Sequence, residues 1–259
     1  MAQRSIVPTN RNPLATLSSY ESELAQYAQE AVDTSPAPLG NFISLRAGVI
    51  SIGGEAVRDN KLRVIILAHR MENAYYVGEF DPDVPKSPVC YAFGTDVANM
   101  YANELSEERQ HLLDYEDGVQ RSPCHGCIQN AFGTADRGRG KACKNQVRLA
   151  IISTEGLTLE ALPTTEVFYV KVPVTSVKGW VLYVKALAEI KKPPFAVMTE
   201  LGTVPDAKTV FKLTFMPLEP ISDKYMPALF ARKAQVEQEI EFPYPQNTAQ
   251  ENLEVKGQK

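Results

Sequence analysis

The sequence LRVIIL at residues 62–67 is an almost continuous apolar run with the length of a buried strand. A second run of the same kind, VRLAII, occupies residues 147–152. Both runs are rich in isoleucine and valine, whose β-branched side chains favour extended backbone. Each run therefore predicts a β-strand.

Shorter strand-like segments flank these two runs. Residues 42–52 alternate apolar with small or polar side chains and end at the Gly53-Gly54 turn. β-Branched and aromatic residues also concentrate at residues 74–77, 89–93, 167–172, 195–201 and 210–215. Many short strands predict an antiparallel sheet closed into an OB-like barrel, and a β-sandwich with peripheral helices is the competing architecture.

Three segments carry apolar residues at helical spacing. The first covers residues 15–32, and the third covers residues 224–240. The second follows a cap at Thr175 or Ser176 and stops at Pro193. We therefore expect helices at the periphery of a mainly β domain.

The chain has 259 residues with 27 basic and 31 acidic side chains, so its formal net charge is −4. A chain-wide polycation is excluded, and any nucleic-acid site has to be a local basic patch. The sequence lacks the run of about 20 apolar residues that crosses a membrane, and it lacks a signal-peptide core at its N-terminus. We therefore expect a soluble cytoplasmic protein without a membrane partner.

Four cysteines, Cys90, Cys124, Cys127 and Cys143, are the strongest chemical signal in the sequence. Three of them fall within 20 residues, and Cys124 and Cys127 form a CxxC pair. Clustered cysteines of a reducing compartment are more often metal ligands than disulfides. Four thiolates complete a tetrahedral zinc site with no open position, which predicts one structural zinc per chain. Free thiols, a redox CxxC pair and a site that uses His125 are the alternatives.

These elements divide the chain into three parts. Residues 1–40 are expected to form an N-terminal helix and a linker, and residues 41–220 the OB-like barrel, with a zinc insertion at about 90–145. Residues 221–259 are expected to form a C-terminal helix and a flexible tail. The predicted fold class is therefore mainly β with peripheral helices (α+β), an OB-like antiparallel barrel carrying a four-cysteine zinc subdomain.

A glycine-rich basic loop follows the CxxC pair. Five cations fall within twelve residues: Arg137, Arg139, Lys141, Lys144 and Arg148. In an acidic chain such a strip is a candidate to follow a phosphate backbone, and Lys171 and Lys212 are candidate further contacts. A solvated loop without a ligand is the alternative.

Aromatic residues cluster on the strands that lead to Cys90. Tyr75, Tyr76, Tyr91 and Phe93 are the candidates for stacking on unpaired bases, which contributes about 1–3 kcal/mol per base. Core packing is the alternative for most of them. A run of acidic side chains at residues 104–117 is a candidate contact for a protein partner.

Motifs of the common enzyme classes are missing from the sequence. It contains no GxxxxGK[ST] phosphate loop, no dinucleotide-binding GxGxxG, no HExxH and no GxSxG. The three histidines, His69, His111 and His125, have no persuasive nucleophile or carboxylate partner nearby in the sequence. We therefore predict a protein without enzymatic activity, and a nuclease with scattered acidic ligands is the enzyme alternative.

Three segments resemble a family of small tailed-phage proteins. They are PVCYAFG at residues 88–94, CHGC at residues 124–127 and FGTADRGRGKACKNQVRLAII at residues 132–152. The family is similar in layout to zinc-containing phage single-stranded DNA-binding proteins with an OB fold. The resemblance implies a sequence-independent single-stranded DNA-binding protein of phage DNA replication or recombination, acting in the host cytoplasm. Replication or recombination proteins are then candidate partners, and the oligomeric state stays open.

In this resemblance the four cysteines match the metal positions, and the loop residues Arg137, Arg139, Lys141 and Lys144 match the basic loop. The C-terminal tail departs from the pattern, because it lacks the strong acidic excess with which many single-strand binders recruit enzymes. A zinc-stabilised protein-interaction module and a metal-dependent nuclease are the alternative functions.

Overall fold

The structure is a computed structural model, and it describes residues 41–77, 87–96, 99–102, 123–135 and 139–244. These residues belong to one compact unit within residues 39–259. They form antiparallel sheets with two α-helices, which confirms the expected mainly β, α+β class. The helix expected at residues 15–32, the acidic run at 104–117 and the tail beyond Tyr244 lie outside the described residues.

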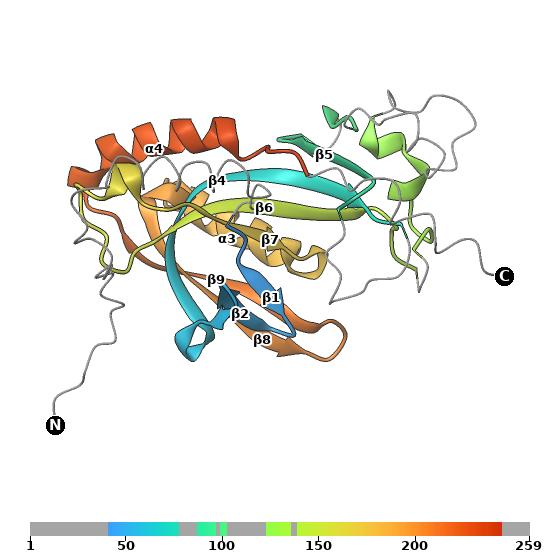
Figure 1. Cartoon of the computed structure of the whole chain (residues 1–259), viewed down its shortest axis with the longest axis horizontal. Helices are drawn as coiled ribbons and strands as arrows, with labels where there is room; N and C mark the ends of the chain where they lie inside the picture. The colour runs from blue at the N-terminus through green and yellow to red at the C-terminus, as the bar shows by residue number, and fades with distance from the viewer. Residues whose placement is uncertain (1–40, 78–86, 97–98, 103–122, 136–138, 245–259) are drawn as a thin grey trace, which may run out of the picture. The chain divides into compact units, whose positions relative to one another are not determined.

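A six-stranded antiparallel sheet forms the centre of this unit (Figure 1). Its strands are β4 (Lys61–Tyr75), β5 (Cys90–Gly94), β6 (Lys144–Ser153), β7 (Phe168–Val172), β8 (Val197–Asp206) and β9 (Val210–Pro220). The strand order is β7-β6-β4-β8-β9. β8 pairs with the first part of β4, and β5 pairs with its last part. The two apolar runs lie in β4 and β6, as predicted, and these two strands pair along most of their length.

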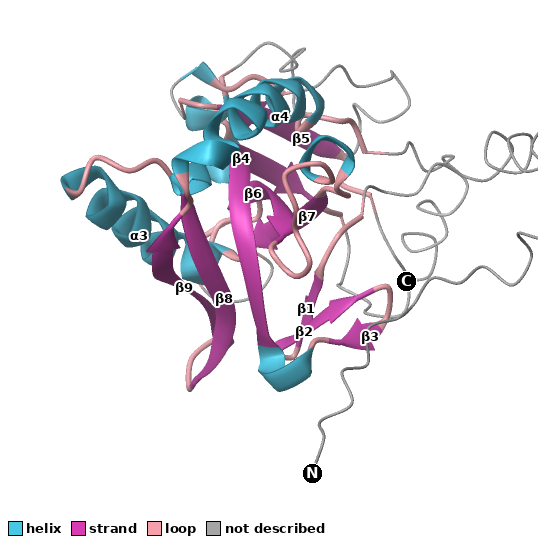
Figure 2. Ribbon diagram, turned by 90° about the vertical axis from the view of Figure 1, so that its left-hand side faces the viewer, coloured by secondary structure: helices cyan, strands magenta, loops and turns pink. Residues whose placement is uncertain are grey.

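The expected OB-like barrel is not confirmed. Within the described residues the main sheet is open, because β7 and β9 are its two ends. A separate three-stranded sheet is formed by β1 (Ser44–Arg46), β2 (Val49–Ile52) and β3 (Glu55–Ala56), near the start of β4 (Figure 2). The strand expected over residues 42–52 is therefore two strands, because Ala47 and Gly48 both adopt left-handed φ angles and reverse the chain.

Asn60 joins the small sheet to the main sheet. Its Oδ1 accepts a hydrogen bond from the Ile50 N–H at 2.7 Å. Its Nδ2 donates to the Gly48 carbonyl oxygen at 2.7 Å and to Thr203 Oγ1 on β8 at 2.6 Å. The backbone of Asn60 is left-handed, with φ of 54°, a conformation that asparagine tolerates better than most residues.

Two helices pack on opposite faces of the main sheet. They are α3 (Val177–Glu189) and α4 (Met226–Glu239), close to the segments predicted from helical spacing. α3 buries Trp180 and Leu187 in one hydrophobic core, and α4 buries Leu229 and Val236 in the other. The residue before α3 is Ser176, whose hydroxyl accepts from the Leu213 N–H at 2.9 Å and ties the helix to β9 instead of capping it.

A register shift in β4, between Ile66 and Ala68, changes which face its alternate residues occupy. Ile66 belongs to the core beneath α3, whereas Ala68 belongs to the core beneath α4. Because side chains alternate along a strand, Glu72 lies on the α4 face and Asn73 on the α3 face. Thus the same end of β4 supplies one buried polar residue to each face.

Candidate functional site

The four cysteines lie around the end of β4. Cys90 is the first residue of β5 and pairs with Tyr75, the last residue of β4. Cys143 comes directly before β6, whose first residue, Lys144, pairs with Ala74. Since β5 and β6 both pair with β4, the sheet brings Cys90 and Cys143 to the two sides of the same strand end.

The CxxC pair reaches this place through a short 3-10 turn that begins at Cys124. Within the turn, the Cys127 N–H donates to the Cys124 carbonyl oxygen at 3.4 Å. The Cys124 N–H donates to the Met100 carbonyl oxygen at 2.7 Å, and the Cys143 N–H donates to the Gln129 carbonyl oxygen at 2.8 Å. These backbone bonds hold the turn and Cys143 in one folded loop.

None of the four cysteines is in a disulfide, and their thiols act on one another electrostatically. Burial, followed by the nearby Cys143, Cys124 and Cys127 thiols, raises the pKa of Cys90 to about 12. Burial and two of the same neighbours raise the pKa of Cys143 to about 12. Effects of this kind require short separations. The four sequence-predicted metal ligands therefore lie near the same end of β4.

Hydrogen-bond donors oppose the effect of burial at two of these sulfurs. Burial raises the pKa of Cys124, and the nearby Asn73 amide opposes that rise. The backbone N–H of Ala74 has the same lowering effect on the pKa of Cys143. Among the described residues, no group of three or more His, Cys, Asp or Glu side chains is arranged to hold a metal ion. The predicted zinc site thus stays a prediction.

The loop between Cys127 and β6 carries an aromatic side chain and several basic side chains at the protein surface. Phe132 is 82% exposed, and the Lys141 Nζ lies 5.1 Å from the centre of its ring. Arg139 and Lys144 are exposed, whereas Lys141 is half-buried. Arg137 lies outside the described residues. Phe132 was absent from the residues singled out for stacking, and its position in an otherwise polar, basic loop was the signal that could have identified it.

The aromatic residues singled out for stacking are all half-buried. Tyr75 packs against the buried Val89. The Tyr91 ring contacts the rings of Phe93 and Tyr244, at centroid distances of 5.6 and 5.1 Å. Burial raises the pKa of Tyr76 to about 12. These rings therefore take part in packing, which was the alternative considered for them.

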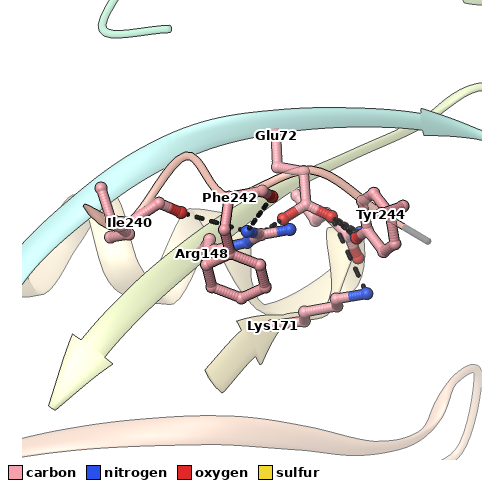
Figure 3. Close-up of polar contacts among 7 residues, drawn as sticks. Glu72, Arg148, Lys171, Ile240, Phe242 and Tyr244 are labelled. Carbon is pink, nitrogen blue, oxygen red and sulfur yellow. Dashed lines mark hydrogen bonds and ion pairs between the residues drawn. The ribbon is translucent and has the colours of Figure 1, made fainter. Parts of the chain in front are cut away.

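Arg148 lies inside the protein on the α4 face (Figure 3). Its side chain is 0% exposed, and its Nε donates to Glu72 Oε2 at 2.6 Å. Its Nη1 donates to the carbonyl oxygens of Ile240 and Phe242, at 3.0 and 3.3 Å. The rings of Phe93 and Phe242 each lie 4.3 Å from the guanidinium carbon. Arg148 therefore presents no surface to a phosphate, which corrects the direct contact expected from its place in the basic run.

The residues after α4 cross this face as a strap, residues 240–244. The Tyr244 hydroxyl donates to Glu72 Oε1, and Arg70 Nε donates to Glu241 Oε1 at 2.7 Å (Figure 3 shows Tyr244 beside Glu72). Lys171 Nζ lies 4.0 Å from Glu72 and 4.4 Å from the Tyr244 ring centre. Burial lowers the pKa of Lys171 to about 8.

The last candidate cation, Lys212, lies away from the basic loop. It belongs to β9 and pairs with Asp206 at the end of β8. The side chain is exposed but already has an acidic neighbour. The structure thus brings together the cysteines and part of the basic loop, and it separates Lys171 and Lys212 from them.

No family model, curated protein or solved structure matches this chain. Among the helices that the structure describes, none is long and apolar enough to span a membrane.

Proposed function

We propose that this protein binds single-stranded DNA without sequence preference and without catalysing a reaction. The observation that carries the proposal is the exposed Phe132 ring, with the Lys141 ammonium beside it on a basic loop. An exposed ring gains little from burial within its own chain, whereas it can stack on an unpaired base of any type. Stacking of this kind contributes about 1–3 kcal/mol per base.

The neighbouring cations supply the electrostatic part of the proposed binding. Arg139 and Lys144 are exposed on the same loop as Phe132, and Arg137 follows the same pattern in the sequence. Contacts of cations with phosphates release counterions, so the affinity is expected to fall linearly with salt on a logarithmic scale. The proposal includes the role that the phage resemblance implies, the coating of single strands in replication or recombination in the host cytoplasm. An OB-like, partly open arrangement of strands also belongs to it.

One structural zinc ion, held by Cys90, Cys124, Cys127 and Cys143, is the second part of the proposal. Thiolates are the preferred ligands of structural zinc, and the four thiols are close enough to shift one another's pKa. A buried amide nitrogen, Asn73 Nδ2, has no hydrogen-bond partner among the described residues and is available to a thiolate. Bound zinc would draw the sulfurs together, add folding free energy and anchor both ends of the basic loop. Metal analysis of purified protein should then give about one zinc per chain.

A protein-interaction module is the second candidate function. Two further apolar residues are exposed beside the CxxC turn. Ile128 directly follows Cys127, and Tyr101 forms an isolated β-bridge with Pro123, the residue before Cys124. Exposed apolar groups of this kind are common where proteins bind each other. This candidate predicts tight binding of a protein partner without a salt-sensitive affinity for DNA.

Fluorescence anisotropy of a labelled thirty-base oligo-dT, measured at several salt concentrations, tests the main proposal. Phe132→Ala should weaken binding by about 5- to 150-fold, the equivalent of one lost stacking contact. Phe230→Ala is the matched control, because Phe230 is 58% exposed but lies on α4. Equal affinities of the wild type and Phe132→Ala would overturn the stacking role. Lack of binding by the wild type at low salt would overturn DNA binding altogether.

A further inference from the structure

Lys141 organises the side chains around Cys124. Its Nζ donates to Asn145 Oδ1 at 2.9 Å and to Asn130 Oδ1 at 3.1 Å. A lysine ammonium has three donors and no acceptor. Both amides must therefore turn their oxygen toward Lys141 and their NH2 group away from it. One cation thus fixes the orientation of two asparagine side chains.

The Asn130 branch ends on the backbone of Cys124. Asn130 is buried, and its Nδ2 donates to the Cys124 carbonyl oxygen at 2.7 Å. The same carbonyl oxygen accepts the N–H of Cys127 within the CxxC turn. Lys141 therefore stabilises the turn that carries two of the four cysteines.

The Asn145 branch ends on the sulfur of Cys124. Asn145 Nδ2 donates to Asn73 Oδ1 at 2.7 Å, so the NH2 group of Asn73 has to point the other way. Asn73 is only 4% exposed, and its Nδ2 has no hydrogen-bond partner among the described residues. Cys124 belongs to the same small core as Ala92, the β5 residue that pairs with Asn73, so its thiol lies on the same face of the sheet as this donor. Asn73 is therefore a buried donor that a thiolate would satisfy.

We propose that Lys141 is a positioning residue for a divalent metal ion at the cysteines, and that it acts through Asn145 and Asn73 to direct an N–H donor at the Cys124 thiolate. Each hydrogen bond from Lys141 to Asn145 and from Asn145 to Asn73 has a donor facing an acceptor, and the ammonium at the start sets their direction. Hydrogen bonds to ligand atoms orient them and typically account for 10- to 100-fold in metal affinity. The positive charge of Lys141 also opposes the negative charge of four thiolates. The inference rests on the zinc part of the proposed function and deepens it.

The same ammonium contacts the Phe132 ring, which links the metal ligands to the proposed DNA contact. Lys141 then acts on DNA through the placement of Phe132, and the phosphate contacts fall to Arg139 and Lys144. Loss of the metal should for this reason weaken DNA binding, although no DNA-contacting atom is removed.

The test compares the wild type with variants by two measurements. The first is zinc affinity, from competition with a chromophoric chelator, and the second is the sulfur-to-cobalt charge-transfer band of the cobalt-loaded protein. Lys141→Met should lower zinc affinity about 10- to 100-fold and shift the band, whereas Lys141→Arg, which retains N–H donors, should recover most of the affinity. Lys185→Met is the matched control, because it removes an exposed cation on α3, outside the cysteine loop, and should leave zinc affinity unchanged.

Asn145→Asp supplies an independent variant. Aspartate still accepts from Lys141 but cannot donate to Asn73, so the Asn73 amide is expected to rotate and turn its oxygen toward Cys124. Zinc affinity should fall and the cobalt band should shift, with the far-UV circular dichroism unchanged. This variant decides the question if Lys141→Met does not fold.

Zinc affinities of Lys141→Met and Asn145→Asp within twofold of the wild type would overturn the positioning role. A wild type that binds no zinc would overturn both the zinc site and this inference. Weakened zinc binding in the variants, together with a wild type that has no affinity for oligo-dT, would support the positioning role and overturn DNA binding alone.

Discussion

Replacing Arg148 with methionine should destabilise the protein severely. The guanidinium is fully buried and its Nε lies 2.6 Å from Glu72 Oε2, a carboxylate that is also 0% exposed. Methionine has a similar length and fills much of the same space, so the main loss is electrostatic and not a cavity. The substitution removes the guanidinium from the buried Glu72, where Lys171 remains 4.0 Å away, and leaves two strap carbonyl oxygens without the Arg148 donor.

The size of the effect follows from the burial of both partners. Removing one member of a buried ion pair typically costs about 3–5 kcal/mol, because the remaining charge is not solvated. With a urea m-value of about 2 kcal/mol/M, the midpoint of unfolding should move by about 2 M. Lys61→Met is the matched control. Lys61 pairs with Glu200 at 2.8 Å, but its side chain is 58% exposed, so this substitution should cost less than about 1 kcal/mol.

Equilibrium urea unfolding, followed by circular dichroism, measures these values. The double variant Glu72→Met/Arg148→Met removes both charges and should recover most of the stability lost by Arg148→Met. A loss below about 1 kcal/mol for Arg148→Met would refute the reasoning, since it would mean that the buried carboxyl group of Glu72 does not depend on Arg148 for its stabilisation. Additive losses in the double variant would refute the coupling of the two residues.

Two further predictions concern Lys171 and Asn60. Because the pKa of Lys171 is lowered from 10.5 to about 8 by burial, the unfolded chain binds more protons than the folded one between these pH values. The free-energy cost of burying the ammonium is largest below pH 8 and disappears as the pH rises to 10.5. Lys171→Met should therefore be more stable than the wild type at pH 7 and should lose this advantage at pH 10.5. Urea unfolding at both pH values measures the difference. A constant difference would contradict the assigned pKa. Asn60→Ala removes three hydrogen bonds and leaves alanine with a left-handed φ, and should cost about 3 kcal/mol in the same assay. Asn60→Gly should cost less, and equal losses for the two variants would exclude a backbone contribution.

The strands and helices could be predicted because their signals are local. The runs at residues 62–67 and 147–152 are apolar on both faces, and the sheet is indeed covered by a helix on each side. Closure of the sheet could not be predicted, since it depends on which strands become neighbours and not on their composition. The hairpin within residues 42–52 was missed because a non-glycine residue, Ala47, adopts a left-handed φ.

The candidate site was only partly predictable for a related reason. Cysteine spacing predicted a shared zinc site, which stays a prediction; strand pairing places Cys90 and Cys143 at the same end of β4. The direction of Arg148 could not be derived from the basic run, because it depends on β-sheet register and on a strap 92 residues later in the chain. One clue was present: an arginine inside the apolar run VRLAII must either break the strand or find a buried partner.

The strap also sets an order of events on the ribosome. Glu72 is synthesised 172 residues before Tyr244, whose hydroxyl donates a hydrogen bond to the Glu72 carboxylate. Arg148 is likewise synthesised before Ile240 and Phe242, whose carbonyl oxygens accept hydrogen bonds from it. Until these residues leave the exit tunnel, the α4 face of the nascent sheet is uncovered, with its charged pair and apolar side chains accessible to water and to chaperones. All strands of the main sheet and the helix α3 have been synthesised once residue 220 is reached, so the α3 face can pack first. Translation should therefore produce a half-covered sheet as an intermediate, and a pause in elongation before residue 240 should prolong its exposure to aggregation.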